Sequence, residues 1–198
     1  MTPRQNRRRL WRLTPVAVVA IGLVIALIAL RPSGTPLNLS ARSTALLGYL
    51  ALFLSIVSSA FARQLYRPFE QPFIRIHHTL AVAGLILLTL HPLSVMLDWQ
   101  DPQVLLPKFS SWAAFLQWGG SPAWILIVLG SLTALLRKPI GRNWRLIHLL
   151  TYVAFTLGTL HATRIGTDFQ CVGMQGVALA LLLLVSLTFI RKRRRRAT

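Results

Sequence analysis

The chain has 198 residues, of which 54% are hydrophobic and 13% are charged. A soluble domain of this size could not bury so much apolar surface, and a disordered basic protein would not contain it. The single cysteine, Cys171, excludes a disulfide scaffold. The chain contains 22 Lys and Arg residues but only 4 Asp and Glu residues. The positions of these cations along the chain indicate whether they bind nucleic acid or a membrane surface.

In chain order, six stretches are apolar and long enough to cross a bilayer, which takes about 20 helical residues. They are residues 13–30, 43–62, 76–97, 109–136, 146–163 and 169–190. Because lipid offers no partner to backbone polar groups, each stretch is predicted to be a helix. The sequence therefore predicts an all-α integral membrane protein whose six transmembrane helices form a bundle over residues 13–190. A basic N-terminus (1–12) and a basic tail (191–198) flank this bundle.

Lys and Arg are divided unequally between the two ends of these stretches. If the chain crosses the membrane six times, the N-terminus, the second and fourth connections and the tail lie on one side of it. That side carries all but four of the 22 Lys and Arg residues. The four on the other side are Arg31, Arg42, Lys108 and Arg164. Since cytoplasmic connections are enriched in Lys and Arg, both termini are predicted to be cytoplasmic in a multi-pass protein of the plasma (inner) membrane. Orientation and lipid contact then explain the charge, and no nucleic acid is expected as a partner.

All five histidines lie in two of these stretches: His77, His78 and His91 in the third, and His148 and His161 in the fifth. Ionisable groups inside a membrane are costly and usually have a partner or a function, and neither stretch contains Asp, Glu, Lys or Arg. The separations are 14 residues (His77 to His91) and 13 residues (His148 to His161), roughly 20 Å along each helix. Because both helices cross in the same direction, one imidazole pair is expected near each face of the membrane.

Two neutral imidazoles that face each other across a helix pair can bind the iron of a flat porphyrin from both sides. The two pairs therefore predict two haems stacked across the bilayer. At about 100° per residue, 14 residues nearly complete four turns, which favours His77 and leaves His78 as the alternate ligand. The 13-residue spacing falls about 140° short, and the sequence does not explain it. Arg164, three residues after His161, could pair with a haem propionate or be an ordinary interfacial arginine.

The segments IHHTLAVAGLILLTLHPL (76–93) and NWRLIHLLTYVAFTLGTLHATRIG (143–166) resemble the third and fifth helices of the ferric reductase-like transmembrane domain family. That family includes NADPH oxidases, ferric reductases and the haem-binding membrane subunit MsrQ (YedZ). The resemblance implies six spans and two b-type haems, with electrons passing from the cytoplasmic to the outer face. It implies an inner haem b between His77 and His148, and an outer haem b between His91 and His161.

The same resemblance shapes the expected partners. Four histidines are typical of the oxidases and ferric reductases, whereas many MsrQ chains have arginine at the position of His77. We expect a stand-alone membrane module, since the sequence ends at RKRRRRAT without a flavin and nicotinamide domain. The expected electron donor is a separate cytoplasmic flavin reductase or a membrane quinol. The expected acceptor is an extracytoplasmic reductase partner, ferric iron or oxygen.

Two other classes of protein stay open. A proton or solute transporter could use the histidines as a relay, although such proteins usually carry an intramembrane acid. Here the acidic residues all fall outside the six stretches: Glu70, Asp98, Asp101 and Asp168. A haem-free structural subunit would use the histidines only for packing. No residue stands out as a catalytic acid, base or nucleophile, so an enzymatic role would be that of the electron-transfer component of an oxidoreductase.

Overall fold

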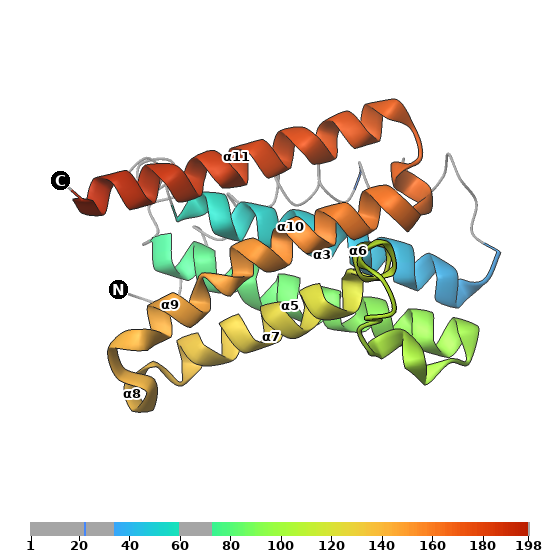
Figure 1. Cartoon of the computed structure of the whole chain (residues 1–198), viewed down its shortest axis with the longest axis horizontal. Coiled ribbons are helices and arrows are strands. Elements are labelled where there is room, and N and C mark those ends of the chain that lie inside the picture. The colour runs from blue at the N-terminus through green and yellow to red at the C-terminus, as the bar shows by residue number, and fades with distance from the viewer. Residues whose placement is uncertain (1–21, 23–33, 60–72, 198) are drawn as a thin grey trace, which may run out of the picture.

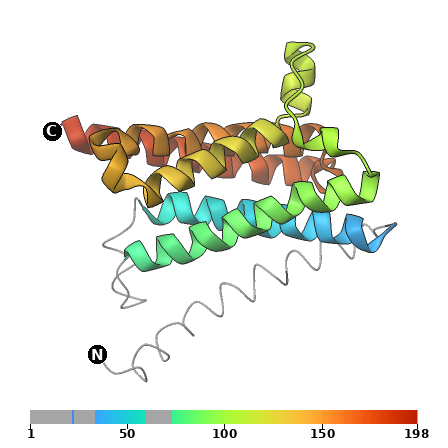
Figure 2. The ribbon, with the colours of Figure 1, turned by 90° about the horizontal axis from the view of Figure 1, so that it is seen from below.

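The computed structural model describes residue 22, residues 34–59 and residues 73–197. Regular secondary structure in these residues is entirely helical, and the long helices lie side by side along one axis (Figure 1). Two of them, α3 (Pro36–Ser58) and α5 (Phe73–Trp99), form one layer. The second layer contains α7 (Gly120–Leu135), α9 (Trp144–His148), α10 (Leu150–Ile165) and α11 (Val172–Ala197), as Figure 2 shows.

Short elements join the long ones at the two ends of the bundle. At one end, α8 (Arg137–Ile140) and η3 (Gly141–Asn143) connect α7 to α9. At the other end, η2 (Pro102–Leu105) and α6 (Trp112–Gln117) connect α5 to α7, and α6 stands out from the bundle (Figure 2). The element η4 (Thr167–Phe169) connects α10 to α11 at this same end.

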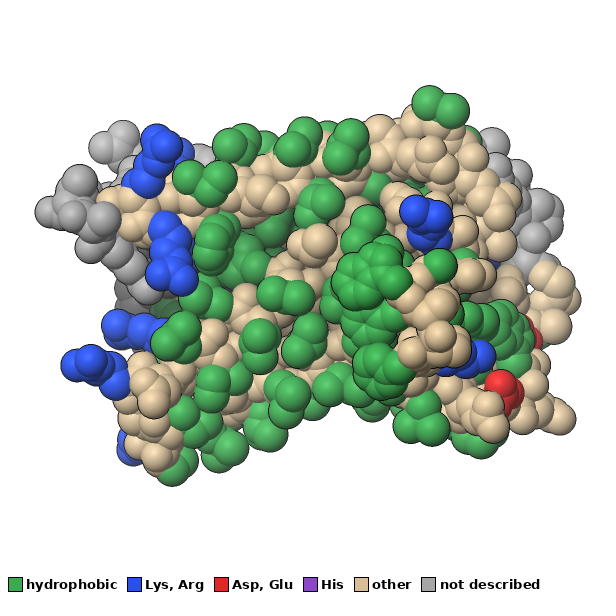
Figure 3. Space-filling view, in the orientation of Figure 1, with side chains coloured by type: hydrophobic (Ala, Val, Ile, Leu, Met, Phe, Trp, Pro, Cys, Tyr) green, Lys and Arg blue, Asp and Glu red, His purple; other side chains and the backbone are tan. Residues whose placement is uncertain are grey.

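Four stretches of helix in the described residues are long and apolar enough to cross a membrane. They are Pro36–Ser58, Ile74–Trp99, Arg137–Ile165 and Val172–Arg194. Large apolar side chains on these helices are exposed, for example Val82 and Ile86 on α5 and Leu183 and Leu187 on α11. Apolar side chains also cover much of the face that Figure 3 shows. Side chains that face lipid do not need to be hidden from water, so this pattern is that of a multi-pass membrane protein.

The predicted helical membrane protein is thus confirmed, and the predicted six spans are found in part. The second, third, fifth and sixth stretches lie in the four long helices. The fourth is broken at residues 118–119, so that only Gly120–Leu135 forms a longer helix, of 16 residues. The first stretch (13–30) and the basic N-terminus lie outside the described residues, apart from residue 22, and the basic tail continues α11 as helix to Ala197.

The start of the second predicted span differs from the structure for a local reason. We expected the second span to begin at Ser43, leaving Arg42 in a connection, but α3 begins at Pro36. Thr35 caps the helix by accepting a hydrogen bond from the backbone N–H of Asn38 at 3.0 Å, and proline is favoured in a first helical turn. Arg42 therefore lies inside the helix, where its side chain is buried.

The helices of the first layer approach closely because glycines meet at their contact. A methyl group added to Gly84 of α5 would lie 3.3 Å from the backbone nitrogen of Leu52 on α3, and one added to Gly48 would lie 2.8 Å from a Leu88 carbon. Small residues allow such backbone contact between membrane helices. The core is formed where α3 meets the second layer, by residues that include Phe53, Ile127, Phe155 and Val185.

Positive side chains gather at the end of the bundle that carries α8 and the end of α11, which we call the basic end (Figure 3). Its cations include Arg137, Lys138, Arg142 and Arg145. Lys192 of α11 donates a hydrogen bond to the hydroxyl of Ser59 at 2.9 Å, which ties α11 to the residue that follows α3. The described cations away from this end are Arg42, Lys108 and Arg164.

Candidate cofactor site

Each of the four histidines predicted as ligands contacts a backbone carbonyl oxygen of a neighbouring helical segment through its Nδ1 atom. On α5, His77 Nδ1 lies 3.0 Å from the oxygen of Ser55, and His91 Nδ1 lies 3.0 Å from that of Ala41. In the second layer, His148 Nδ1 lies 2.9 Å from the oxygen of Gly130, and His161 Nδ1 lies 2.9 Å from that of Gln117.

These contacts fix the protonation of the rings. A carbonyl oxygen can only accept a hydrogen bond, so Nδ1 of each ring must carry the proton. The Nε2 atom of each neutral imidazole then bears the lone pair that a metal requires. Metal-binding histidines usually donate their other N–H to a carbonyl or carboxylate in this way. The donor set therefore fits iron bound through Nε2 of all four residues.

The carbonyl acceptors repeat the spacing of the histidines. Ser55 and Ala41 are 14 residues apart on α3, as His77 and His91 are on the antiparallel α5. Gly130 and Gln117 are 13 residues apart, as His148 and His161 are. The first hairpin thus presents two imidazoles through one continuous contact between α3 and α5, so a single packing register orients both of its rings.

A break between α9 and α10 accounts for part of the rotation that the 13-residue spacing lacks. The N–H of Leu149 bonds the oxygen of Leu146 at 3.1 Å, and the N–H of Tyr152 bonds the oxygen of Leu149 at 3.0 Å. Such i to i+3 bonds tighten a helix to about 120° and about 2 Å per residue, against about 100° and 1.5 Å in an α-helix. The break adds both rotation and length, which brings His148 toward the face that carries His161.

At the basic end, His77 and His148 face each other. Their ring centres are 6.3 Å apart and the ring planes are nearly perpendicular, at 79°. A metal–imidazole bond is about 2 Å long and a ring nitrogen lies roughly 1 Å from its ring centre, so two rings on opposite sides of one ion have centres roughly 6 Å apart. The observed separation suits two axial ligands of one metal.

His78, the alternate ligand, is placed differently. Its side chain is exposed, whereas His77 is half-buried, and the two ring centres are 5.9 Å apart. In the part of the chain that the structure describes, the His78 ring makes no hydrogen bond to a carbonyl like those of the four other histidines. The geometry therefore favours His77 over His78.

At the opposite end, His91 and His161 line a cavity of about 440 Å³ between the two layers. Its walls are mostly apolar and include the aromatic side chains of Tyr49, Trp124 and Phe155. This volume lies within the range of roughly 300–1,000 Å³ typical of small-molecule and cofactor sites. A flat apolar ligand with a central metal, such as a porphyrin, suits both the cavity and the two imidazoles.

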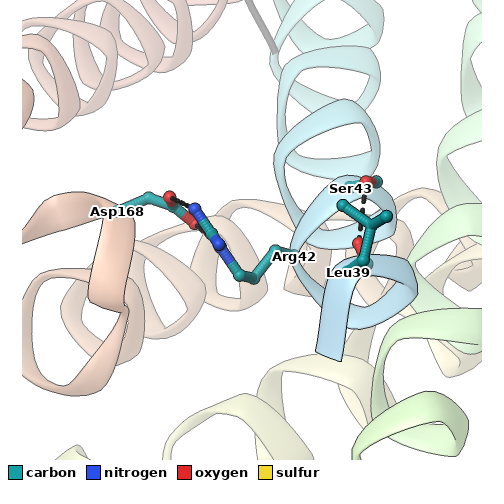
Figure 4. A network of polar contacts seen from close by, with 4 residues as sticks. All are labelled: Leu39, Arg42, Ser43 and Asp168. Atoms are coloured by element: carbon teal, nitrogen blue, oxygen red, sulfur yellow. Dashed lines mark hydrogen bonds and ion pairs between the residues drawn. The ribbon is translucent and has the colours of Figure 1, made fainter. Parts of the chain in front are cut away.

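A buried ion pair lines the same cavity, and the sequence did not reveal it. Arg42 donates from Nε to Asp168 Oδ2 at 3.1 Å and from Nη2 to Oδ1 at 2.5 Å (Figure 4). The two side chains are only 9% and 6% exposed. Asp168 belongs to η4, 126 residues away in the chain. The proline and threonine at the start of α3 were the signal that would have placed Arg42 inside a helix.

The predicted propionate partner, Arg164, is exposed and is not among the residues that line the cavity. Arg42 is the arginine that lines it. Among the described residues, no group of three or more His, Cys, Asp or Glu side chains is arranged to hold a metal ion by itself. The imidazoles instead occur as two separate pairs.

Fold and site together define a multi-pass helical membrane protein with paired histidines between two layers of helices. Residues 37–168, two thirds of the chain, match the family model described as a domain of unknown function, DUF8596. The chain belongs to this family. The matched range contains all five histidines and both members of the buried ion pair. No curated protein and no solved structure matches the chain.

Proposed function

We propose that the protein is a membrane cytochrome b that carries electrons across the bilayer through two haems, each bound by two histidines. His77 and His148 would bind the inner haem, and His91 and His161 the outer one. The observation that supports this most strongly is the shared geometry of the four imidazoles, each with Nδ1 on a neighbouring carbonyl and Nε2 bearing the lone pair.

The resemblance to the ferric reductase-like family is a second support, and it supplies the wider architecture of the proposal. Residues 13–30 would be a further span, α7 would complete a six-helix bundle, and both termini would be cytoplasmic. The cations of the basic end favour this orientation, since cytoplasmic ends are enriched in Lys and Arg. His77 and His148 would then lie near the cytoplasm.

Haem iron held by two histidines supplies one-electron oxidation and reduction. The protein's own residues bind and orient the group. The carbonyls of Ser55, Ala41, Gly130 and Gln117 hold the ligand rings at fixed angles. Apolar and aromatic walls exclude water from the outer site. Arg42 and Asp168 place a buried ion pair, which carries no net charge, in the wall of that site.

The partners follow from where each pair lies. A cytoplasmic flavin reductase or a membrane quinol would donate electrons near the basic end, where an acidic protein surface or anionic lipid is attracted. An extracytoplasmic reductase, ferric iron or oxygen would accept them at the opposite end. The protein would thus serve as the electron-transfer component of an oxidoreductase.

A histidine relay for protons has less support in the geometry. The Nδ1 protons are held by backbone carbonyls, and the two histidines of the α9–α10 segment are separated by buried apolar side chains such as Ala154 and Phe155. Proton flux through liposomes containing haem-free protein is the result that would favour the relay instead.

The test is to purify the protein from haem-replete cells and measure haem by the pyridine haemochromogen assay. We expect two haems per chain and a low-spin b-type spectrum. His77→Ala and His148→Ala should remove one spectroscopic centre, and His91→Ala and His161→Ala the other. His78→Ala is the matched control and should keep both. Colourless wild-type protein, or equal haem loss in the His78 variant, would contradict the proposal.

A further inference from the structure

The two helical hairpins that carry the histidines are joined by two matching hydrogen bonds. Trp124 of α7 donates from Nε1 to the hydroxyl of Thr89 on α5 at 3.1 Å. The hydroxyl of Tyr49 on α3 lies 2.9 Å from the hydroxyl of Thr159 on α10. Each bond runs from the first helix of one hairpin to the histidine-bearing helix of the other.

The direction of both bonds is fixed by the threonines. The hydroxyl of Thr89 donates its one proton to the oxygen of Leu85 at 2.8 Å, and that of Thr159 donates to the oxygen of Phe155 at 2.8 Å. Each threonine can then only accept from its aromatic partner. Tyr49 is therefore the donor to Thr159, as Trp124 is to Thr89.

The equivalence of the two bonds is also visible in the sequence. Thr-Leu-His occupies residues 89–91 and residues 159–161, so each threonine precedes a cavity histidine by two residues. At the same offset of 70 positions, Arg75 and His78 correspond to Arg145 and His148. The two hairpins thus share a Thr-Leu-His sequence at their cavity histidines.

Tyr49 and Trp124 are the donors and are also walls of the cavity. The Tyr49 ring stacks on Phe155, with centres 4.8 Å apart and planes at 15°. Each hydrogen bond therefore fixes an aromatic wall and, through a threonine two residues away, the segment that carries a cavity histidine. The basic-end pair, His77 and His148, lies roughly 18 Å further along the helices from these threonines.

We propose that Thr89 with Trp124 and Thr159 with Tyr49 are equivalent positioning pairs, which set the separation and orientation of His91 and His161 at the outer cofactor. This role rests on the proposed function and goes beyond it. It predicts that these two threonine–aromatic hydrogen bonds control the outer centre and leave the inner centre unaffected. Loss of either hydroxyl leaves a half-buried aromatic donor without its partner and releases one wall of the cavity.

The test compares Thr89→Val and Thr159→Val with the serine variants at the same positions in full-length haem-loaded protein. Valine keeps the shape of threonine without the hydroxyl, and serine keeps the hydroxyl. We expect both valine variants to shift the outer haem potential in the same direction, and to accelerate transfer of the outer haem to a haem-scavenging protein by roughly fivefold. The inner haem should not change, and serine should restore the wild-type values.

Thr156→Val is the matched control. Thr156 lies on α10, is partly buried and bonds the oxygen of Tyr152 at 3.1 Å, but among the described residues its hydroxyl has no partner on another helix. It should leave both haems unchanged. Unfolding in detergent supplies a measurement without haem, because double-mutant cycles of Thr89→Val with Trp124→Phe and Thr159→Val with Tyr49→Phe should each show coupling of the same sign.

The outcomes separate this role from the proposed function. A colourless wild-type protein would overturn both. If the protein contains haem but the reduction potential of the outer haem is unchanged in the valine variants, only the positioning role is overturned. The same conclusion would follow if the inner haem moved equally, or if Thr156→Val had the same effect.

Discussion

Gly120, the first residue of α7, lies against the imidazole of His161. A methyl group added at this position would lie 2.8 Å from Nε2 and 3.0 Å from each of the two neighbouring ring carbons. Non-bonded heavy atoms normally approach to about 3.5–4.0 Å. Gly120→Ala should therefore push the ring away by roughly 0.7–1.2 Å, or break the bond between Nδ1 and the Gln117 oxygen that holds it.

The consequence should appear at the cofactor and not in the fold. Metal sites hold their ligands to within about 0.2 Å, and loss of a supporting contact costs about 10–100-fold in affinity, or about 1.4–2.7 kcal/mol. Alanine is about 0.5–1 kcal/mol more favourable than glycine in the middle of a helix, and the gain is smaller at the first residue of α7. The variant should thus lose outer haem while its free energy of unfolding in the haem-free state stays equal or rises slightly.

The assay is a redox titration of the absorption spectrum together with haem content, beside thermal unfolding of the haem-free protein in detergent. Gly176→Ala is the control, because an added methyl group there meets nothing within 4 Å. It should keep both haems. If Gly120→Ala keeps the outer centre at its wild-type potential, or loses the inner centre to the same degree, the placement of a ligand on His161 Nε2 is refuted.

Three further predictions concern other contacts. Arg42→Gln or Asp168→Asn should each lower the free energy of unfolding by about 3–5 kcal/mol, because one buried charge loses its partner, and the double variant should be less destabilised than the sum of the two in chemical denaturation. The Ser55 hydroxyl and the Ser55 backbone oxygen each lie 3.0 Å from His77 Nδ1, so Ser55→Ala should keep the backbone contact and leave the inner centre in place, and a lost absorption band would contradict that. One alanine inserted after Leu149 should rotate His148 by about 100° relative to α10 and abolish the inner centre alone, as haem content per chain would reveal.

The long helices could be predicted from the sequence because lipid imposes a simple rule, about 20 apolar residues without charge. That rule also misplaced the start of the second span, since it began the span at Ser43, after the charged Arg42. The charge is tolerated there because Asp168 neutralises it from 126 residues away. No local pattern around Arg42 contains that information, and only the packing of η4 against α3 supplies it.

The candidate ligands could be predicted for a similar reason, because histidines in apolar helices are rare and their spacing is visible. The carbonyl partners of these histidines could not be predicted, because every residue has a carbonyl. Only the register in which the helices pack determines which four carbonyls meet the histidine rings. The break at Leu149 was equally hidden. Nothing in the sequence from Leu146 to Tyr152 is proline or glycine, so the tightened turn arises from tertiary packing.

The use of backbone carbonyls as acceptors would link the proposed cofactor binding to helix packing. Three of the four acceptors belong to Ser55, Ala41 and Gly130, whose small side chains let an imidazole approach the backbone. Sliding α5 along α3 by one residue would break both of its histidine bonds together, because the two acceptors share one register. A ligand that binds only the correctly oriented rings stabilises that register by mass action. The free energy of haem binding should therefore add to the stability of both hairpins at once, and removing haem should loosen α3 from α5 as well as α7 from α10.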